Sequence, residues 1–159
     1  MIPTHNSELV SKRFPAWYLG RNPHKRFIAA SYSATLAERF GKQTRDLIDS
    51  SAFKAVFPEV ILKKGSQASD QWDLSIMNGN DIIDGGGYIC AGVGGSITGF
   101  GGDMISIDDP FKDRKEADSA TIRETVKDWY TSTLYTRLEA AGGIVLTHTR
   151  WHEDDLAGY

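Results

Sequence analysis

The segment Met104-Ile105-Ser106-Ile107-Asp108-Asp109-Pro110 decides the fold class. Its two isoleucines, with Met104 beside them, are typical of a buried strand that is covered on both faces of a parallel sheet. Pro110 has no N–H to donate to a neighbouring strand, so we expect the strand to end here. Asp108 and Asp109 therefore lie at the carboxyl end of a strand, which is where open α/β sheets bind their ligands.

The two adjacent carboxylates suit different roles, because neighbouring strand residues point to opposite faces. In a nucleotide hydrolase, Asp108 would hold Mg²⁺ and Asp109 would polarise the attacking water. The alternative is a solvated Asp-Asp turn, and four residues alone do not decide between the two.

The composition predicts one ordinary globular domain, or a piece of one. The chain has 159 residues, of which 40% are hydrophobic and 25% charged. Its net charge of −3 indicates no broad nucleic-acid-binding surface, so any DNA contact must be local or lie outside this chain. Cys90 is the only cysteine, which excludes an internal disulfide. No apolar run approaches membrane-spanning length, and the N-terminus lacks a signal-peptide pattern.

The hydrophobic pattern around this segment predicts alternating strands and helices. We expect a helix from Ser7 through Trp17, a second one over 33–48, a short helical piece at 53–57, a long helix from a Thr121/Glu124 capping box to Gly142-Gly143, and a last helix near Glu153. Expected strands cover 26–31, 72–76, 82–83, 88–93, 104–107 and 144–147, with a hairpin at Asn78-Gly79. Residues 63–70 and 112–118 are expected as loops, and 85–87 as a break.

Several other motifs are weaker. The glycine-rich stretch 92–102 has Ile97 where a dinucleotide fingerprint needs glycine, which favours a turn between strands. His148 and His152 are four apart but lack the His-Glu-x-x-His spacing, so zinc is disfavoured. The tryptophans at 17, 72 and 129 lie in apolar patterns that favour the core, whereas Trp151 stays open as a stacking platform.

In sequence order, the chain resembles the ATPase domain of phage terminase large subunits, the motors that pump viral DNA into capsids. The matching stretches are Ser7-Glu8-Leu9-Val10-Ser11, Phe14-Pro15-Ala16-Trp17, Gly94-Gly95-Ser96-Ile97-Thr98-Gly99, Ile107-Asp108-Asp109-Pro110, Asp128-Trp129-Tyr130 and Thr149-Arg150-Trp151-His152-Glu153-Asp154-Asp155-Leu156-Ala157-Gly158. The resemblance implies an α/β fold of the P-loop NTPase (RecA/ASCE-like) type: a mostly parallel sheet, flanked by helices, with an antiparallel hairpin near Asn78.

The resemblance also implies a function and a site. It implies ATP and Mg²⁺ as cofactors, Asp108 as the metal ligand, Asp109 as the catalytic base, and nucleotide contacts from Ser7, Thr147, Thr149 and Arg150. Taken without the resemblance, Ser7 is equally an N-cap, and the other three are a polar strand end. The implied partners are double-stranded DNA, the portal protein, the small terminase subunit and further copies in a ring, in the cytoplasm of a bacterial host.

Two departures from the family pattern bear on activity. Pro3-Thr4-His5-Asn6-Ser7-Glu8 stands where the family has approximately Pro-Arg-His-Gly-Lys-Ser-Glu, so the glycine and the phosphate-binding lysine are replaced. The strand before that loop and the carboxy-terminal nuclease domain are also absent from these residues. We therefore expect residues 1–159 to be a partial ATPase domain, with a non-catalytic prophage remnant or interaction module as the alternative.

Overall fold

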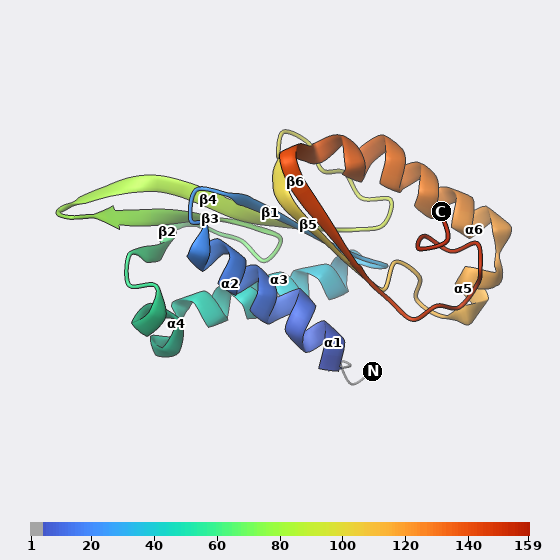
Figure 1. The fold of residues 1–159 in the computed structure, drawn as a ribbon, viewed down its shortest axis with the longest axis horizontal. Helices are drawn as coiled ribbons and strands as arrows, with labels where there is room; N and C mark the ends of the chain where they lie inside the picture. The colour runs from blue at the N-terminus through green and yellow to red at the C-terminus, as the bar shows by residue number, and fades with distance from the viewer. Residues whose placement is uncertain (1–4) are drawn as a thin grey trace.

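A computed structural model describes residues 5–159 as a six-stranded sheet with helices on both faces (Figure 1). The strand order is β2-β3-β4-β1-β5-β6. Strands β4, β1, β5 and β6 are mutually parallel, and β2 and β3 complete the sheet as an antiparallel hairpin layer on the β4 side. The expected fold class, a mostly parallel α/β sheet with an antiparallel hairpin, is confirmed.

The strands are β1 (Arg26–Ser31), β2 (Val60–Gln67), β3 (Gln71–Asn78), β4 (Asp81–Gly92), β5 (Gly102–Asp108) and β6 (Leu138–Thr147). The helices are α1 (His5–Glu8), α2 (Phe14–Arg21), α3 (Ala34–Asp49), α4 (Ser51–Val56), α5 (Arg114–Asp118) and α6 (Ala120–Trp129). A π-helical turn, η1 (Leu9–Arg13), joins α1 to α2, and η2 (Tyr130–Leu134) and η3 (Tyr135–Arg137) continue α6.

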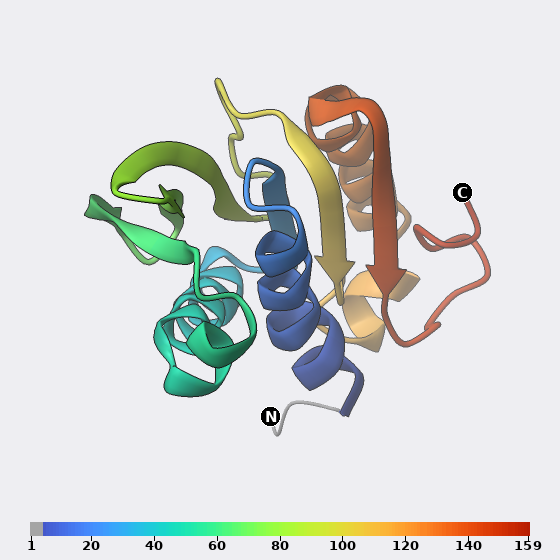
Figure 2. The same ribbon diagram turned by 60° about the vertical axis from the view of Figure 1, so that its left-hand side comes forward.

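Two hydrophobic clusters form the core, one on each face of the sheet. Phe27, Ala29, Trp72 and Tyr88 face the layer of α2, α3 and α4, whereas Ile28, Ile105, Ile107, Val126 and Trp129 lie on the side of α6 (Figure 2). Alternate residues of β1 and β5 thus enter opposite clusters, as expected for strands that are covered on both faces. Trp72 and Trp129 are core residues as predicted, but Trp17 is 54% exposed, so its prediction as core was wrong.

Two strands are longer than the sequence pattern predicted. Residues 63–70 were expected to be a loop, but β2 extends to Gln67 because Val60 and Leu62 pair with Ile76 and Leu74 of β3. The predicted break at 85–87 is also wrong, because β4 runs through it. A Cβ on Gly86 would lie 1.8 Å from the carbonyl oxygen of Lys25, so glycine permits a close chain crossing there rather than a turn.

The second half of the chain departs from prediction at its helix ends. Ser119, not Thr121, caps α6, since its hydroxyl accepts from the N–H of Ile122. The helical segment ends at Arg137 and not at Gly142, because Leu138 already pairs with Gly102 of β5. Residues 114–118, expected as loop, form α5, which Asp113 caps. The helix expected near Glu153 is absent, and residues 153–157 form turns.

Candidate functional site

The carboxyl ends of three parallel strands bring the predicted site residues together. Asp108 at the end of β5 lies in register with Ser31 of β1 on one side and with Thr147 of β6 on the other. The strand that ends at Asp108 is therefore adjacent to the strand that ends at Thr147, as expected from two buried strands with polar ends. This sheet edge is the position where open α/β sheets bind ligands.

Asp108 is a buried carboxylate that two serine hydroxyls contact. Its side chain is covered by α1 and η1, and the residue is only 4% exposed. Ser11 Oγ donates to Asp108 Oδ2 at 2.6 Å, and the Ser7 hydroxyl makes a second hydrogen bond to the same side chain. Burial raises the pKa of Asp108 above its usual range, the two serine hydrogen bonds lower it, and the neighbouring Asp109 raises it further. The result is a carboxylate whose charge the protein alone compensates incompletely.

Ser7 lies at the predicted sheet edge but in a different local role from an N-cap. Helix α1 begins at His5, so Ser7 is inside the helix, where its side chain is buried against the end of β5. Ser11 lies one helical turn further on, and the sequence gave it no role. The i, i+4 spacing of the two serines was the available signal, because it places both hydroxyls on one helix face.

Asp109 is fixed between the ends of β1 and β6. Its backbone N–H donates to Thr147 O at 2.9 Å, and its carbonyl accepts from the N–H of Tyr32 at 3.0 Å. Its carboxylate Oδ1 accepts from the N–H of Thr149 at 3.3 Å. The backbone has φ 46°, a left-handed conformation that costs free energy in a non-glycine residue. This conformation turns the Asp109 side chain out of the regular strand alternation and towards the loop after β6.

The remaining predicted residues are placed differently from one another. Thr147 is half-buried at the end of β6, and Thr149 is exposed beyond it. The Arg150 guanidinium is directed to its own loop: Nε donates to Asp155 Oδ2 at 2.9 Å, and one terminal nitrogen donates to the Glu153 carbonyl at 3.1 Å. Asp155 is fully buried, so this pair anchors residues 150–155.

The oxygen donors at this edge fit Mg²⁺. Two carboxylates and the hydroxyls of Ser7 and Ser11 are hard ligands, and Mg²⁺ in nucleotide sites is held by one or two carboxylates together with phosphates. The raised pKa of the buried Asp108 is also consistent with a group that a cation would stabilise.

The phosphate-binding side of the site is less complete. Lys12 and Arg13, which follow Ser11, both pair with Glu8. Of the segment that replaces the family's phosphate loop, Pro3 and Thr4 lie outside the described residues, as do the side chains of His5 and Asn6. Among the remaining residues, neither aspartate of the site forms an ion pair.

The two histidines near this edge do not form a zinc site with a third ligand in the described part of the chain. His148 Nε2 lies 3.9 Å from Asp155 Oδ1, and His152 Nδ1 accepts from the backbone N–H of Asp154. Between residues 7 and 159, no group of three or more His, Cys, Asp or Glu side chains could hold a metal ion.

Comparison with known families decides the identity. The model of the N-terminal part of the terminase large subunit, T4likevirus-type, matches residues 7–157. The chain belongs to this family. The match includes both aspartates, both serines and the loop around Arg150 and Asp155. No protein with curated annotation matches this terminase sequence.

Solved terminase structures show the same fold. The large terminase ATPase domain of Thermus phage P74-26 aligns with a TM-score of 0.65 at 12% identity, over 94% of this chain and 59% of that one. An arginine-to-alanine mutant of that domain aligns with the same score and identity, over 91% and 55%. The large terminase of a thermophilic bacteriophage in complex with ATP-gamma-S aligns at 0.41 and 11%, over 96% and 38%, which is too weak to use. The chain thus spans less than two thirds of these relatives.

Proposed function

We propose that this chain forms part of the ATPase domain of a terminase large subunit, the motor subunit that packages viral DNA, and that the edge at Asp108 and Asp109 is its Mg-nucleotide site. The observation that supports this most is the buried Asp108 at the carboxyl end of β5, in contact with two hydroxyls from the helix that approaches the same edge. A solvated Asp-Asp turn would have neither the burial nor these contacts.

Each residue of the site has a proposed role. Asp108 and the hydroxyl of Ser7 hold Mg²⁺, which when bound offsets the negative charge of the nucleotide phosphates. Asp109, at the mouth of the site, orients the attacking water and accepts its proton. Thr147 and Thr149 lie on the strand end that contacts Asp109, so they are placed to sense the terminal phosphate. Arg150 contacts phosphate only if its guanidinium leaves Asp155.

The whole motor's partners are proposed from the family. They are double-stranded DNA, the portal protein, the small terminase subunit and further copies of the subunit in a ring, in the cytoplasm of the bacterial host. The described residues contain no helix long and apolar enough to cross a membrane. The alignment to 59% of a solved terminase ATPase domain supports residues 1–159 as a partial ATPase domain, distinct from any nuclease domain.

A second candidate is a non-catalytic remnant or interaction module. His5-Asn6 in place of the family's Gly-Lys favours it, because that lysine and the surrounding backbone N–H groups are what binds the phosphates. On this account the Asp108 site still attracts Mg²⁺, but the nucleotide is bound weakly and is not hydrolysed.

Nucleotide binding and hydrolysis assays on three proteins test the two candidates. We expect the unmodified chain to show no ATPase activity above background. A protein in which an upstream strand and Pro-Arg-His-Gly-Lys-Ser replace the present start should bind ATP, and Asp108→Asn in that protein should abolish the Mg²⁺ dependence. Asp81→Asn, on the exposed hairpin, is the matched control. Turnover by the unmodified chain that Asp109→Asn abolishes would exclude the remnant; a restored protein that binds no nucleotide would contradict the proposed site.

A further inference from the structure

Strand β6 lies at the edge of the sheet but has the sequence of a central strand. Ile144, Val145 and Leu146 are consecutive apolar residues, and all three are only half-buried. Val145 faces the α2 side of the sheet, whereas Ile144 and Leu146 face the α6 side. Edge strands are usually protected by lysine, proline or a bulge, and residues 144–147 have none of these. A run that is apolar on both faces is typical of a strand with neighbours on both sides.

The outer edge of β6 also presents unpaired backbone groups. Thr147 O accepts from the N–H of Asp109, so the Thr147 backbone faces β5. Because backbone direction alternates along a strand, Val145 faces β5 as well, and the N–H and C=O groups of Ile144 and Leu146 point away from the sheet. No strand among residues 5–159 pairs with this side of β6.

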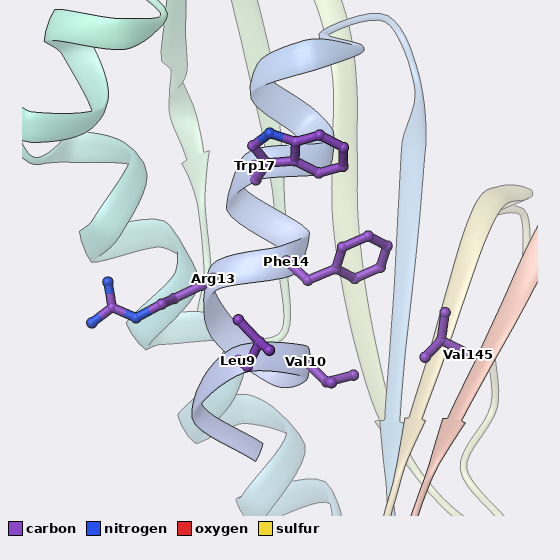
Figure 3. Close-up of a pocket in the computed structure, with 6 residues that line it drawn as sticks. All are labelled: Leu9, Val10, Arg13, Phe14, Trp17 and Val145. Carbon is purple, nitrogen blue, oxygen red and sulfur yellow. The ribbon is translucent and has the colours of Figure 1, made fainter. Parts of the chain in front are cut away.

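An apolar groove flanks this edge. Leu9, Val10, Phe14 and Trp17 of the α1–α2 segment line it with Val145, and its volume is about 380 Å³. Figure 3 shows Val10 and Phe14 pointing from the helix towards Val145. Leu9 is 60% exposed, as expected if the helix extends its apolar face past the last strand. On the opposite face, a second hollow of about 260 Å³ is lined by Ile107, Tyr130, Ile144, Leu146, Leu156 and Tyr159.

We propose that the free edge of β6 and the groove beside it bind one extended apolar polypeptide segment, added to the sheet as a strand parallel to β6. The unpaired backbone groups require a strand rather than a helix, and the two apolar hollows require apolar side chains on both of its faces. Parallel strands are the ones that are covered on both faces, as β1 and β5 are here. The matched solved ATPase domain is also longer than this chain, which aligns to 59% of it, so this fold accommodates further polypeptide.

Hydrogen exchange measured residue by residue by NMR tests this acceptor site without nucleotide, and so independently of the proposed function. The probe is a synthetic peptide of about ten residues, the upper length of ordinary strands, with a Val-Ile-Val-Leu-Val centre and lysines at both ends for solubility. We expect saturable binding that slows exchange of the Ile144 and Leu146 amides about tenfold. The Val145 amide, which already faces β5, should change little. A peptide with proline at its centre should not bind.

Variants of two equally exposed residues locate the binding. Leu9→Gln, in the groove, should weaken peptide binding about tenfold, and Ile82→Gln, on the hairpin at the other end of the sheet, should leave it unchanged. Three results would overturn the proposal: no slowing at Ile144 and Leu146 at saturating peptide; slowing at β2, the opposite edge, instead; or concentration-dependent slowing at β6 without peptide, which would make a second copy of the chain the occupant.

Discussion

The hydroxyl of Ser11 donates a 2.6 Å hydrogen bond to Asp108 Oδ2, joining positions 97 residues apart in the chain. This bond connects the helix that begins the described chain to the end of the central strand β5, and it is buried. It defines the geometry of the candidate site more closely than any other contact, because the carboxylate it holds is the proposed Mg²⁺ ligand.

Ser11→Ala should destabilise the fold more than an ordinary hydroxyl deletion. A hydrogen bond to a charged group contributes about 1.5–3 kcal/mol, and the substitution leaves a buried carboxylate with one partner fewer. We expect a loss of about 2 kcal/mol in urea unfolding at neutral pH. Ser66→Ala is the matched control, since Ser66 Oγ donates to Asp73 Oδ2 at 2.7 Å in a more exposed position. An equal loss for both variants would contradict the special burial of the Ser11–Asp108 pair.

Asp108→Asn should change how stability depends on pH. The pKa of Asp108 is raised in the folded protein, chiefly by burial, so the folded state binds a proton more tightly than the unfolded state. The stability that this proton contributes is fully present below the unfolded pKa of about 3.9 and is lost as pH rises through the folded pKa. Asp108→Asn removes this loss, so its stability relative to the unmodified chain should increase with pH across that range.

Denaturant melts at several pH values measure this effect, and Mg²⁺ supplies its control. At neutral pH, Mg²⁺ should raise the stability of the unmodified chain and leave that of Asp108→Asn unchanged, since a ligand that binds only the folded state stabilises it. A stability difference between the two proteins that is independent of pH would show that Asp108 is not strained by its burial.

The left-handed backbone at Asp109 predicts an order among substitutions. Asparagine tolerates this conformation, so Asp109→Asn should fold with little loss, whereas a β-branched residue at φ 46° should cost about 1–3 kcal/mol. Thermal unfolding of Asp109→Asn and Asp109→Val measures the difference. Asp109→Gly separates strain from side-chain loss, because it removes both the carboxylate and the strain. Equal melting temperatures for the valine and asparagine variants would contradict the conformation.

Asp155 should control the order of the loop after β6. It is fully buried, pairs with Arg150 Nε and accepts the N–H of Ala157 at 3.1 Å. Asp155→Ala should therefore speed hydrogen exchange at the amides of Asp155, Ala157 and Gly158 by about tenfold or more, with smaller effects on β5. Asp118→Ala, on the exposed α5, is the control. Unchanged exchange in the loop would show that Arg150 and Asp155 do not anchor it.

The sequence predicted those features that depend on strand ends. Ile105 and Ile107 identified a strand buried on both faces, Pro110 its end, and Thr147 the end of the neighbouring strand. Parallel strands place their carboxyl ends at one edge, so the site followed from local patterns alone.

What the sequence did not predict depends on contacts between distant segments. Ser11 acquires its role only because α1 and η1 cross over the end of β5. Gly86 looks like a strand break locally, and its reason is the carbonyl of Lys25, which it must approach. Leu138 ends a helical pattern because β5 offers it a strand partner. In each case tertiary contacts override the local preference.

The most direct measurement of the central claim, that the edge at Asp108 is a Mg-nucleotide site, is an NMR titration of the labelled chain with Mg²⁺ and ATP. We predict Mg²⁺-dependent shifts that are largest at Ser7, Ser11, Asp108 and Asp109, that disappear in Asp108→Asn, and that persist in Asp81→Asn. Shifts that centre on another part of the sheet, or that are the same in Asp108→Asn as in the unmodified chain, would contradict it.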